Sequence, residues 1–396
     1  MKVKIKDIAD VIDGPHATPI KTKTGPFYLG IDAISKDGII NLKKSAHLSE
    51  NDWIKWTKRV NPKENDIVFS YEATLGRYAI IPHGFKGALG RRLAVLRVKS
   101  KDVNVHWLYY FLNSPYWKKY IDQKVVYGST VTRIPVKDYP NYVLDLPPRE
   151  QQDLVTSILY NIDSKIANNN AISKELESMA KTIYDYWFLQ FEFPDKNGKP
   201  YKSNGGKMVW NDQLKQEIPE GWEVLPLDKY ADVKKGKLLT AKETNLNGKY
   251  KVISAGLTYS YHHDQYNRDE NTITVSASGA NAGFVNLWYE KIYANDCTTV
   301  QGVTVGTTDY IFNFLKSAQT YLYQQARGSA QPHVYPKDIA NINLAVPPKN
   351  IIDKYTLLVG DYNKQISAIV KENQQLKSLR DFLLPLLMNG QVEVTD

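Results

Sequence analysis

The segment YGSTVTRIPVKDYPNYVLDLPP at residues 127–148 recurs as RGSAQPHVYPKDIANINLAVPP at residues 327–348, without a gap in either copy. Eight of the 22 aligned positions are identical, namely Gly128/Gly328, Ser129/Ser329, Lys137/Lys337, Asp138/Asp338, Asn141/Asn341, Leu144/Leu344, Pro147/Pro347 and Pro148/Pro348. Each copy leads directly into a long stretch with helical patterning. A repeat of this size predicts a tandem duplication, in which two similar domains are each followed by a helix.

Two shorter matches support the duplication. ADVIDG at Ala9–Gly14 is echoed by ADVKKG at Ala231–Gly236, and VFSYEATLGRY at Val68–Tyr78 aligns with VSASGANAGFV at Val275–Val285. This alignment places Ala73 over Ala280 and Gly76 over Gly283. The offset between the copies falls from 222 to 207 and then to 200 residues. The second copy is therefore expected to have shorter surface loops, where two related binding domains would diverge.

The stretch after each Pro-Pro pair has apolar residues largely at a spacing of three and four. In the first stretch they are Val155, Ile158, Ile162, Ile172, Leu176, Met179, Ile183 and Tyr186, and in the second Tyr355, Val359, Tyr362, Ile366, Ile369, Leu376, Leu379 and Leu383. One asparagine, Asn169 or Asn373, falls within each stripe, and Pro385 is expected to end or kink the second helix. The pattern favours an antiparallel coiled coil whose register the asparagines fix, although two unrelated amphipathic helices remain an alternative.

The expected fold class is α+β, with two tandem α/β domains, a pair of long helices and a pseudo-two-fold internal repeat. β-rich segments such as DIVFS (66–70) and LAVLRV (93–98) alternate with helical ones. A Gly-, Pro- and Lys-rich stretch after the first helix reads as a linker. The expected boundaries are 1–146 for the first domain, 147–189 for the first helix, 190–222 for the linker, 223–346 for the second domain and 347–390 for the second helix.

Composition narrows the class of protein. The 396 residues are 42% apolar and 23% charged, which is typical of globular domains. The charged start and the lack of a long apolar run predict a cytoplasmic protein without a membrane span. Residues 1–150 carry 25 Lys and Arg against 15 Asp and Glu, a balance of +10, so the other 246 residues balance at −1. A basic first domain favours a polyanionic partner.

Catalytic and metal-binding motifs are missing from the sequence. It contains no Walker loop, no dinucleotide-binding glycine motif, no nucleophile elbow and no HExxH. Triplets such as Asp122-x-Lys124 and Asp163-x-Lys165 are too short to indicate a nuclease. His262-His263 has no further ligand at metal spacing, and Cys297, the single cysteine, is expected to be a small buried residue. The sequence therefore predicts neither catalysis nor a metal site.

Polar loops follow predicted strands in both copies and suit DNA. The first copy carries SYEATLGR at Ser70–Arg77 and GRR at Gly90–Arg92, whose hydroxyl and guanidinium groups can bind bases or phosphate. The second copy carries SASGANAG at Ser276–Gly283 and NDCTTVQ at Asn295–Gln301, which are better suited to adenine. Turn formation and loop solvation are the alternative explanation for these residues.

The repeated Gly-Ser segment is a further candidate, because a turn that offers backbone N–H groups beside a basic side chain suits phosphate. A plain structural turn is the alternative. With the loops above, the candidate DNA-binding residues of the first domain are Tyr71, Thr74, Arg77, Arg91, Arg92, Ser129, Thr130, Arg133 and Lys137. Those of the second domain are Lys237, Ser278, Asn281, Thr298, Arg327, Ser329, Gln331, His333 and Lys337.

The order of these motifs, together with their duplication, resembles the specificity subunits of type I restriction-modification systems. Ile218-Pro219-Glu220-Gly221-Trp222 looks like the family's IPEGW signature, and Pro147-Pro148-Arg149-Glu150-Gln151-Gln152 is similar to its PPLxEQ helix start. The second copy, Pro347-Pro348-Lys349-Asn350-Ile351-Ile352, departs from that motif. The resemblance covers the whole chain.

The resemblance implies that each domain is a target-recognition domain reading one half of a bipartite site in double-stranded DNA. It also implies that the helices set the spacer and dock two methyltransferase subunits, to which restriction-translocase subunits are added. S-adenosylmethionine, Mg²⁺ and ATP would bind to those partners, and this chain would hold no cofactor. The alternatives are a DNA adenine methyltransferase or nuclease with degenerate motifs, and a structural protein that bridges two protein ligands.

Overall fold

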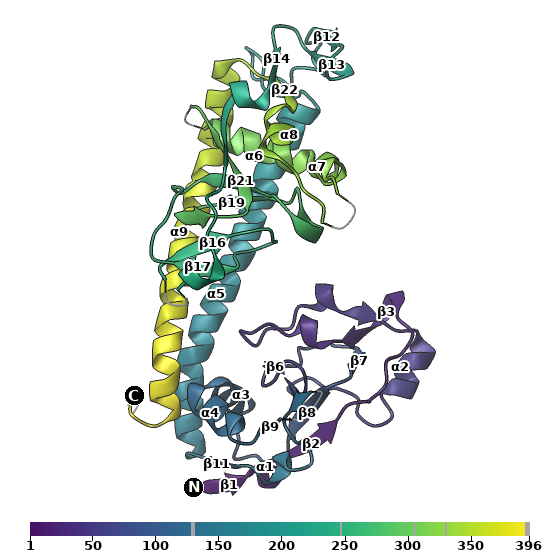
Figure 1. The fold of residues 1–396 in the computed structure, drawn as a ribbon, viewed down its shortest axis with the longest axis vertical. Helices are drawn as coiled ribbons and strands as arrows, with labels where there is room; N and C mark the ends of the chain where they lie inside the picture. Colours follow the sequence, from purple (N-terminus) through teal and green to yellow (C-terminus); the bar gives the residue numbers. More distant parts are fainter. Residues whose placement is uncertain (128–130, 246–247, 305, 329–330, 393–396) are drawn as a thin grey trace. The chain divides into compact units, whose positions relative to one another are not determined.

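The computed structural model describes residues 1–127, 131–245, 248–304, 306–328 and 331–392 (Figure 1). The chain divides into two compact units, which we call unit 1 and unit 2. Unit 1 is Met1–Ile166 together with the segment that starts at Leu376, and unit 2 is Ala167–Gln375. Each unit contains one copy of the repeat and part of each long helix.

Unit 1 mixes short strands and helices. Its elements are β1 (Lys2–Lys4), α1 (Ile5–Ile8), β2 (Ala9–Asp13), β3 (Thr22–Leu29), β4 (Ala46–His47), α2 (Glu50–Trp56), β5 (Ile67–Ser70), β6 (Tyr78–Ile80), β7 (Gly87–Leu89), β8 (Leu93–Val98), α3 (Val105–Asn113), α4 (Pro115–Asp122), β9 (Val126–Tyr127), β10 (Thr132–Arg133) and β11 (Val143–Asp145).

Unit 2 repeats this order after a hairpin of its own. Its elements are β12 (Met208–Asn211), β13 (Gln216–Pro219), β14 (Glu223–Pro226), β15 (Ala231–Lys235), β16 (Tyr250–Ile253), β17 (Tyr261–His263), β18 (Thr272–Ser276), β19 (Val285–Trp288), β20 (Ile292–Ala294), β21 (Cys297–Gly302), α6 (Thr307–Ser317), α7 (Gln319–Gln325), α8 (Pro336–Ala340) and β22 (Asn343–Val346).

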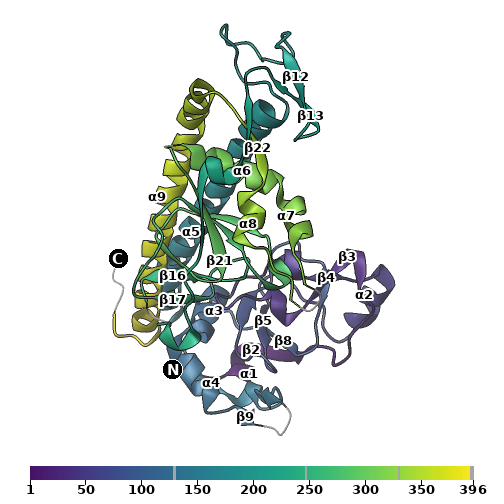
Figure 2. The same ribbon diagram turned by 45° about the horizontal axis from the view of Figure 1, so that its top comes forward.

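The sheets of the two units have the same topology, which confirms the α+β class and the internal repeat. The four-stranded antiparallel sheet runs β2-β8-β5-β6 in unit 1 and β15-β21-β18-β19 in unit 2. The three-stranded sheet is β4-β3-β7 or β17-β16-β20, and its second pair, β3 with β7 or β16 with β20, is parallel in both. In Figure 2, α6 can be followed beside the sheet of unit 2. The domain boundaries at residues 146, 189, 222 and 346 remain predictions.

The ADVxxG echo has a steric cause. Gly14 donates its N–H to the carbonyl oxygen of Leu93, and a Cβ atom at Gly14 would lie 2.5 Å from that oxygen. Gly236 follows the equivalent strand β15, and a Cβ atom there would lie 2.1 Å from the carbonyl oxygen of Asn295. Because only glycine allows such an approach, both copies retain it.

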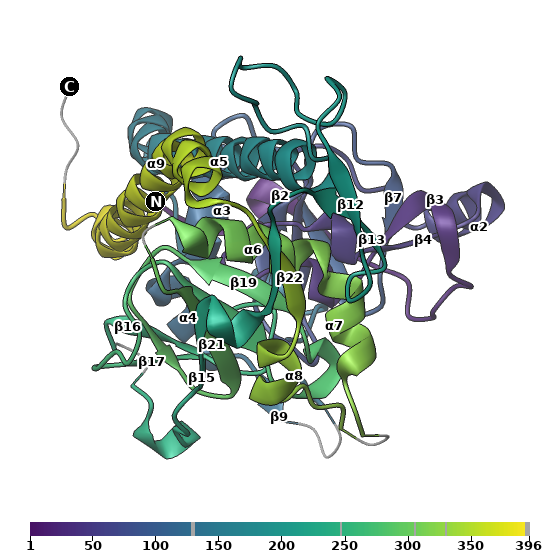
Figure 3. The same ribbon diagram turned by 90° about the horizontal axis from the view of Figure 1, so that it is seen from above.

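The IPEGW segment closes the core of unit 2. Ile218 and Trp222 are buried, and Gly221 between them has a φ of +83°, a conformation that favours glycine. Trp222 packs against Phe188 of the turn that ends the first long helix and against Phe191 and Phe193 of the linker. The β12–β13 hairpin, visible in Figure 3, pairs Met208–Asn211 with Gln216–Pro219 just before this turn. The linker therefore contributes to the core of unit 2.

The two long helices are α5 (Arg149–Tyr184), which continues into a π turn at Asp185–Leu189, and α9 (Lys349–Met388). They pack antiparallel within each unit. In unit 2, Asn169 is 2% exposed and donates to Asn373 at 2.9 Å, while Trp187 lies against Tyr355. The expected contact between the two asparagines is therefore present. Pro385 lies inside α9 and does not end it.

The predicted apolar stripe is wrong in part. Ile172 and Met179 are 48% and 47% exposed, whereas Ala180 and Tyr184 are buried. The buried face of α5 thus follows a different set of helical positions near its C-terminal end. The reason is that Tyr184 packs against Tyr310 of α6, so that the domain as well as α9 selects the buried face. Among the described residues, no helix combines the length and apolar character needed to cross a membrane.

Buried aromatic residues hold the repeated segment of unit 1 against its sheet. Trp117 donates its Nε1–H to the hydroxyl of Tyr78 at 3.0 Å, and the Tyr78 and Tyr139 hydroxyls lie 3.0 Å apart. Burial raises the pKa of Tyr78 to about 12. Tyr139 lies within residues 127–148, so this contact fixes the repeat next to the strands that carry the polar loops.

Candidate nucleic-acid interface

Three predicted segments of unit 1 meet at one place. The loop after β5 donates from the N–H of Tyr71 to the carbonyl oxygen of Arg92, at the start of β8, over 3.2 Å. The carbonyl oxygen of Tyr71 accepts from the N–H of Ile134 at 2.8 Å, and Glu72 forms a β-bridge with Arg133. The polar loop, the GRR turn and Arg133 and Ile134 of the repeated segment are therefore parts of one surface. We call this surface site 1.

The same three segments meet in unit 2 to form site 2. The N–H of Ala277 donates to the carbonyl oxygen of Asp296 at 3.4 Å. The carbonyl oxygen of Ala277 accepts from the N–H of Val334 at 2.9 Å. Ser278 forms the β-bridge with His333. These contacts show that Glu72, Arg92 and Arg133 correspond to Ser278, Asp296 and His333. The backbone of the site is thus duplicated, while the side chains differ.

The loop alignment expected from the sequence is wrong by one residue. Ala73 has a φ of +65°, and its counterpart with a φ of +74° is Gly279 rather than Ala280. Gly76 and Gly283 correspond as expected, since they donate to the carbonyl oxygens of Ser70 and Ser276. Site 2 therefore has one more residue in this loop.

The corresponding side chains differ in charge. In site 1, Arg92 forms an ion pair with Glu72 at 2.8 Å, and both side chains are about a third exposed or less. In site 2, the hydroxyl of Ser278 donates to the carboxylate of Asp296. Site 1 therefore places a guanidinium where site 2 places a carboxylate.

Several candidate residues are exposed and can reach a ligand. In site 1 they are Arg91, Arg133 and Lys137, and in unit 2 they are Lys237, Arg327, Gln331 and Lys337. Arg327 also lies 3.5 Å from Asp338, an ion pair on the surface. Thr74, Asn281 and His333 are half-buried. Cations predominate among the exposed side chains, which suits a phosphate backbone.

Other candidates of site 1 have internal roles. The Arg77 guanidinium donates to the carbonyl oxygen of Ile34 at 2.7 Å, so it holds a turn in place and is not available as a base reader. Tyr71 is 5% exposed, and its pKa is raised by burial and by the nearby Asp13 carboxylate. Arg92 is engaged by Glu72. These three side chains therefore support the backbone of the site through contacts within the domain.

In unit 2, Thr298 and Ser278 are 1% and 4% exposed. Thr298 lies in the central strand β21, where β15 and β18 flank it on both sides. Neither side chain presents a surface to a ligand, so their assignment as contacts is not supported. Ser129, Thr130 and Ser329 lie outside the described residues.

Sequence reasoning missed the acidic members of the two sites. Glu72 and Asp296 lie within the predicted loops but were not assigned a role, and Asp13 was not considered. Asp13 lies 2.9 Å from His16 and 3.9 Å from Arg59, and it faces Tyr71. Alignment of Arg91-Arg92 with Asn295-Asp296, the two residues before the strands that begin at Leu93 and Cys297, was the signal that could have identified Asp296 as the counterpart of Arg92.

Over the described ranges, no three His, Cys, Asp or Glu side chains lie close enough to hold a metal ion. Burial raises the pKa of the Cys297 thiol to about 12, as expected for a small core residue. His262 and His263 lie on strand β17.

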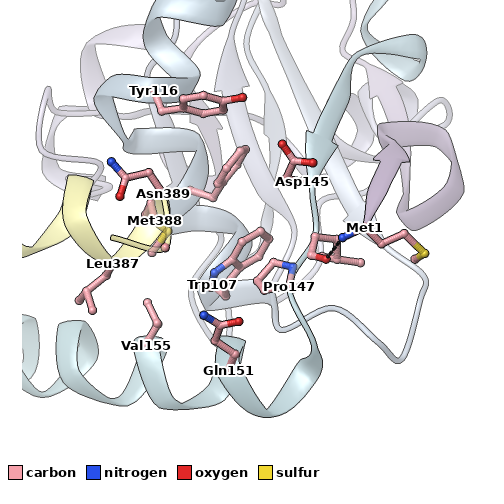
Figure 4. Close-up of a pocket in the computed structure, with 13 residues that line it drawn as sticks. Met1, Trp107, Tyr116, Asp145, Pro147, Gln151, Val155, Leu387, Met388 and Asn389 are labelled. Carbon is pink, nitrogen blue, oxygen red and sulfur yellow. Dashed lines mark hydrogen bonds between the residues drawn. The ribbon is translucent and has the colours of Figure 1, made fainter. Parts of the chain in front are cut away.

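A cavity of about 270 Å³ lies elsewhere in unit 1 (Figure 4). It is lined chiefly by apolar side chains, including Trp107, Val155 and Met388. The corresponding residues of unit 2 are Tyr310, Tyr355 and Phe188, and the Phe188 ring lies 4.7 Å and 4.9 Å from the other two. Aromatic rings thus fill in unit 2 the space that is open in unit 1, and the cavity is a packing difference between the copies.

Comparison with known proteins identifies relatives over the whole chain. The family described as "Type I restriction modification DNA specificity domain" matches residues 1–178 and 219–377. The MjaIX type I restriction enzyme specificity subunit of Methanocaldococcus jannaschii is 25% identical over 99% of this chain and 93% of its own length. The putative MjaX specificity subunit of the same organism is also 25% identical, with the same coverage.

A solved structure has the same fold. The S subunit of a type I restriction-modification system from M. genitalium superposes with a TM-score of 0.56 at 16% identity, and the match covers 98% of this chain and 95% of that one.

Proposed function

The chain belongs to the type I restriction-modification DNA specificity family, and we propose that its two sites each read one half of a bipartite DNA sequence. The observation that carries this proposal is the duplicated site. Three segments meet in the same backbone arrangement in both units, yet Arg92 and Glu72 are replaced by Asp296 and Ser278. A conserved frame with exchanged side chains is what two readers of different half-sites require.

We also propose that α5 and α9 form an antiparallel coiled coil that docks two methyltransferase subunits. The Asn169–Asn373 contact and the antiparallel packing inside each unit support the pairing. Two subunits fit a chain whose helices are related by an internal repeat. Restriction-translocase subunits would join this assembly, and S-adenosylmethionine, Mg²⁺ and ATP would bind to the partners. In this proposal the chain itself is not an enzyme.

The helices would then act as a ruler for the spacer. α9 has 40 residues, and at 1.5 Å per residue it is roughly 60 Å long, which equals about 18 base pairs of B-DNA. The test removes four residues from within Lys165–Lys181 and four facing residues from within Gln365–Arg380. We expect a shorter spacer in the methylated site, and an unchanged spacer would contradict the ruler.

The main test reconstitutes the chain with its methyltransferase in a host and maps modified adenines by single-molecule sequencing. We expect a bipartite motif that disappears when this chain is omitted. Binding of the complex should also depend on sequence and weaken steeply with salt. If the isolated chain bound S-adenosylmethionine or cut DNA alone, the enzyme alternative would replace this proposal. DNA binding without sequence dependence would favour the structural alternative.

A further inference from the structure

One buried side chain ties the globular part of unit 1 to the start of α5. Gln152 is 0% exposed. Its Oε1 accepts from the N–H of Asn104 at 2.8 Å, and its Nε2 donates to the carbonyl oxygens of Asp102 at 2.9 Å and Pro147 at 2.8 Å. Because all three partners are backbone groups, the amide holds the loop after β8 in one position on the helix.

Neighbouring side chains reinforce this contact. Asn104 donates its side-chain amide to Asp153 at 2.6 Å, and Arg149 donates to the carbonyl oxygen of Lys101 at 2.8 Å. Asn104 also caps α3 by accepting from the N–H of His106 at 2.9 Å. The loop Lys101–Asn104 is therefore attached to α5 at several points, and Gln152 is the buried one among them.

The residue of unit 2 at the position of Gln152 cannot make these hydrogen bonds. Ile352 occupies the position of Gln152 and has no polar side-chain atom to offer the loop. Lys349 pairs with Asp353 of its own helix at 2.6 Å. A groove opens here, lined by Val303, Thr304 and Ile352 among others. The departure from the PPLxEQ motif in the second copy therefore has a structural counterpart at the junction between domain and helix.

The domain of unit 2 is held to α9 through another element. The hydroxyl of Tyr289 donates to Asn363 at 3.2 Å, and the hydroxyl of Ser367 donates to the carbonyl oxygen of Tyr289 at 3.4 Å. Gln374 donates to Glu290 in the same turn. In the corresponding turn of unit 1, His83 pairs with Glu64, and Lys86 with Glu50, both within the domain. The two domains are thus attached to the helices in different ways.

We propose that Gln152 is a positioning residue that sets the angle of the first recognition domain on α5, and with it the register of site 1 on DNA. The loop it holds follows β8, and β8 begins beside Arg92 in site 1. The six residues of β8 span about 20 Å. A small tilt of the domain on α5 at Gln152 would therefore displace the reading surface by a fraction of a base step. This inference rests on the proposed function.

The test uses the reconstituted methyltransferase complex and duplexes with the native spacer or with one base pair added or removed. Gln152→Ile imposes the residue of the second copy, and Gln152→Met keeps the length of the side chain without its hydrogen bonds. We expect either variant to lower the preference for the native spacer by about three- to tenfold. Ile352→Leu is the matched control in the second copy and should leave the preference unchanged.

The outcomes separate the two proposals. A uniform loss of methylation on every spacer would mean that Gln152 only stabilises the fold, and it would overturn the positioning role, as would an unchanged preference in both variants. If Gln152→Ile does not assemble, Gln152→Met decides. Absence of sequence-dependent methylation by the unmodified complex would instead reject the proposed function itself.

Discussion

Site 1 and site 2 share a backbone and differ in what that backbone carries. Arg133 of site 1 is exposed beside the ion pair of Arg92 with Glu72, whereas site 2 has His333 beside the hydrogen-bonded pair of Ser278 with Asp296. The β-bridges and glycine turns thus form a backbone framework whose equivalent positions accept side chains of different charge. Recognition can therefore diverge without a change of fold.

Removal of an exposed arginine from site 1 has the largest expected effect. Arg133→Ala or Arg91→Ala should weaken binding by about 1–3 kcal/mol if the guanidinium reads a base, and only for DNA that carries the first half-site. Binding measurements on duplexes with one half-site scrambled at a time would test this.

His333→Ala, at the counterpart of Arg133, is the matched variant and should affect only the second half-site. A second pair of variants is Lys137→Ala and Lys337→Ala. Each should reduce the slope of log affinity against log salt concentration by about one, as expected for loss of a phosphate contact. Equal losses at both half-sites from a single arginine variant would break the comparison.

The helices offer the next comparison. In unit 1, Asp163 of α5 pairs with Arg380 of α9 at 3.0 Å and accepts from the hydroxyl of Tyr110 at 2.8 Å. The counterparts two hundred residues away are Asn363 and Ala180. Arg380→Ala should destabilise unit 1 by about 1–2 kcal/mol, because a half-buried carboxylate loses its cation. Denaturant unfolding, monitored in each unit by hydrogen exchange, measures the loss in the free energy of unfolding.

The double variant Asp163→Asn, Arg380→Ala transfers the pair of unit 2 into unit 1. It should recover a large part of the lost stability, since no half-buried charge is then left without a partner and the Asp381 carboxylate, which also loses Arg380, is exposed. The amide that replaces the Asp163 carboxylate could still accept from the hydroxyl of Tyr110, as Asn363 accepts from Tyr289. A double variant that is less stable than Arg380→Ala alone would show that the two helix contacts are not equivalent.

Much of this organisation could be predicted from the sequence, because duplication preserves what the backbone needs. Gly14 and Gly236 are present in both copies because neither position has room for a Cβ atom, and Asn169 and Asn373 fall in the helical stripes. Such constraints are local and leave a visible pattern. The fold class, the repeat and the two asparagines follow from them.

The role of each candidate site residue could not be predicted in the same way, because it depends on contacts between distant segments. Arg77 and Arg91 are both arginines in polar loops, yet one binds the carbonyl oxygen of Ile34 and the other is exposed. Ile172 and Met179 were wrongly placed in the buried stripe for a similar reason, since the domain beside the helix decides which face is buried. Spacing along the chain does not encode these partners.

His106 and Asp309 should make the stability of their two units depend on pH in opposite directions. His106 and Asp309 precede the corresponding residues Trp107 and Tyr310. Burial lowers the pKa of His106, and burial raises the pKa of Asp309 to about 6 against the hydrogen bond from Asn363. The contribution of neutral His106 to the stability of unit 1 is present above pH ~6.5 and is lost as the pH falls. The contribution of protonated Asp309 to the stability of unit 2 is present below pH ~4 and is lost as the pH rises through about 6.

We therefore expect His106 to add to the stability of unit 1, and Asp309 to subtract from that of unit 2, between about pH 5 and about pH 8. Asp309→Asn should stabilise unit 2 at pH ~8 by about 1 kcal/mol and remove most of its pH dependence. Hydrogen exchange of the two units at both pH values gives the answer. A pH dependence of unit 2 that is the same in Asp309→Asn as in the unmodified chain would contradict the assignment to Asp309.

The smallest expected effect concerns the cavity of unit 1. Met388 lines that cavity, and its counterpart in unit 2 is Phe188, whose ring packs against Tyr310 and Tyr355. Met388→Phe should fill part of the space and stabilise unit 1 by about 0.5–1 kcal/mol, because buried apolar area increases without displacing a polar group. Phe188→Met is the reciprocal variant and should destabilise unit 2 by a similar or larger amount, since its neighbours are already packed around the ring. Thermal unfolding of both variants measures the pair. Destabilisation by Met388→Phe would mean that the two copies have diverged in backbone as well as in side chains at this end of the helices, and the repeat would then no longer be a guide to packing there.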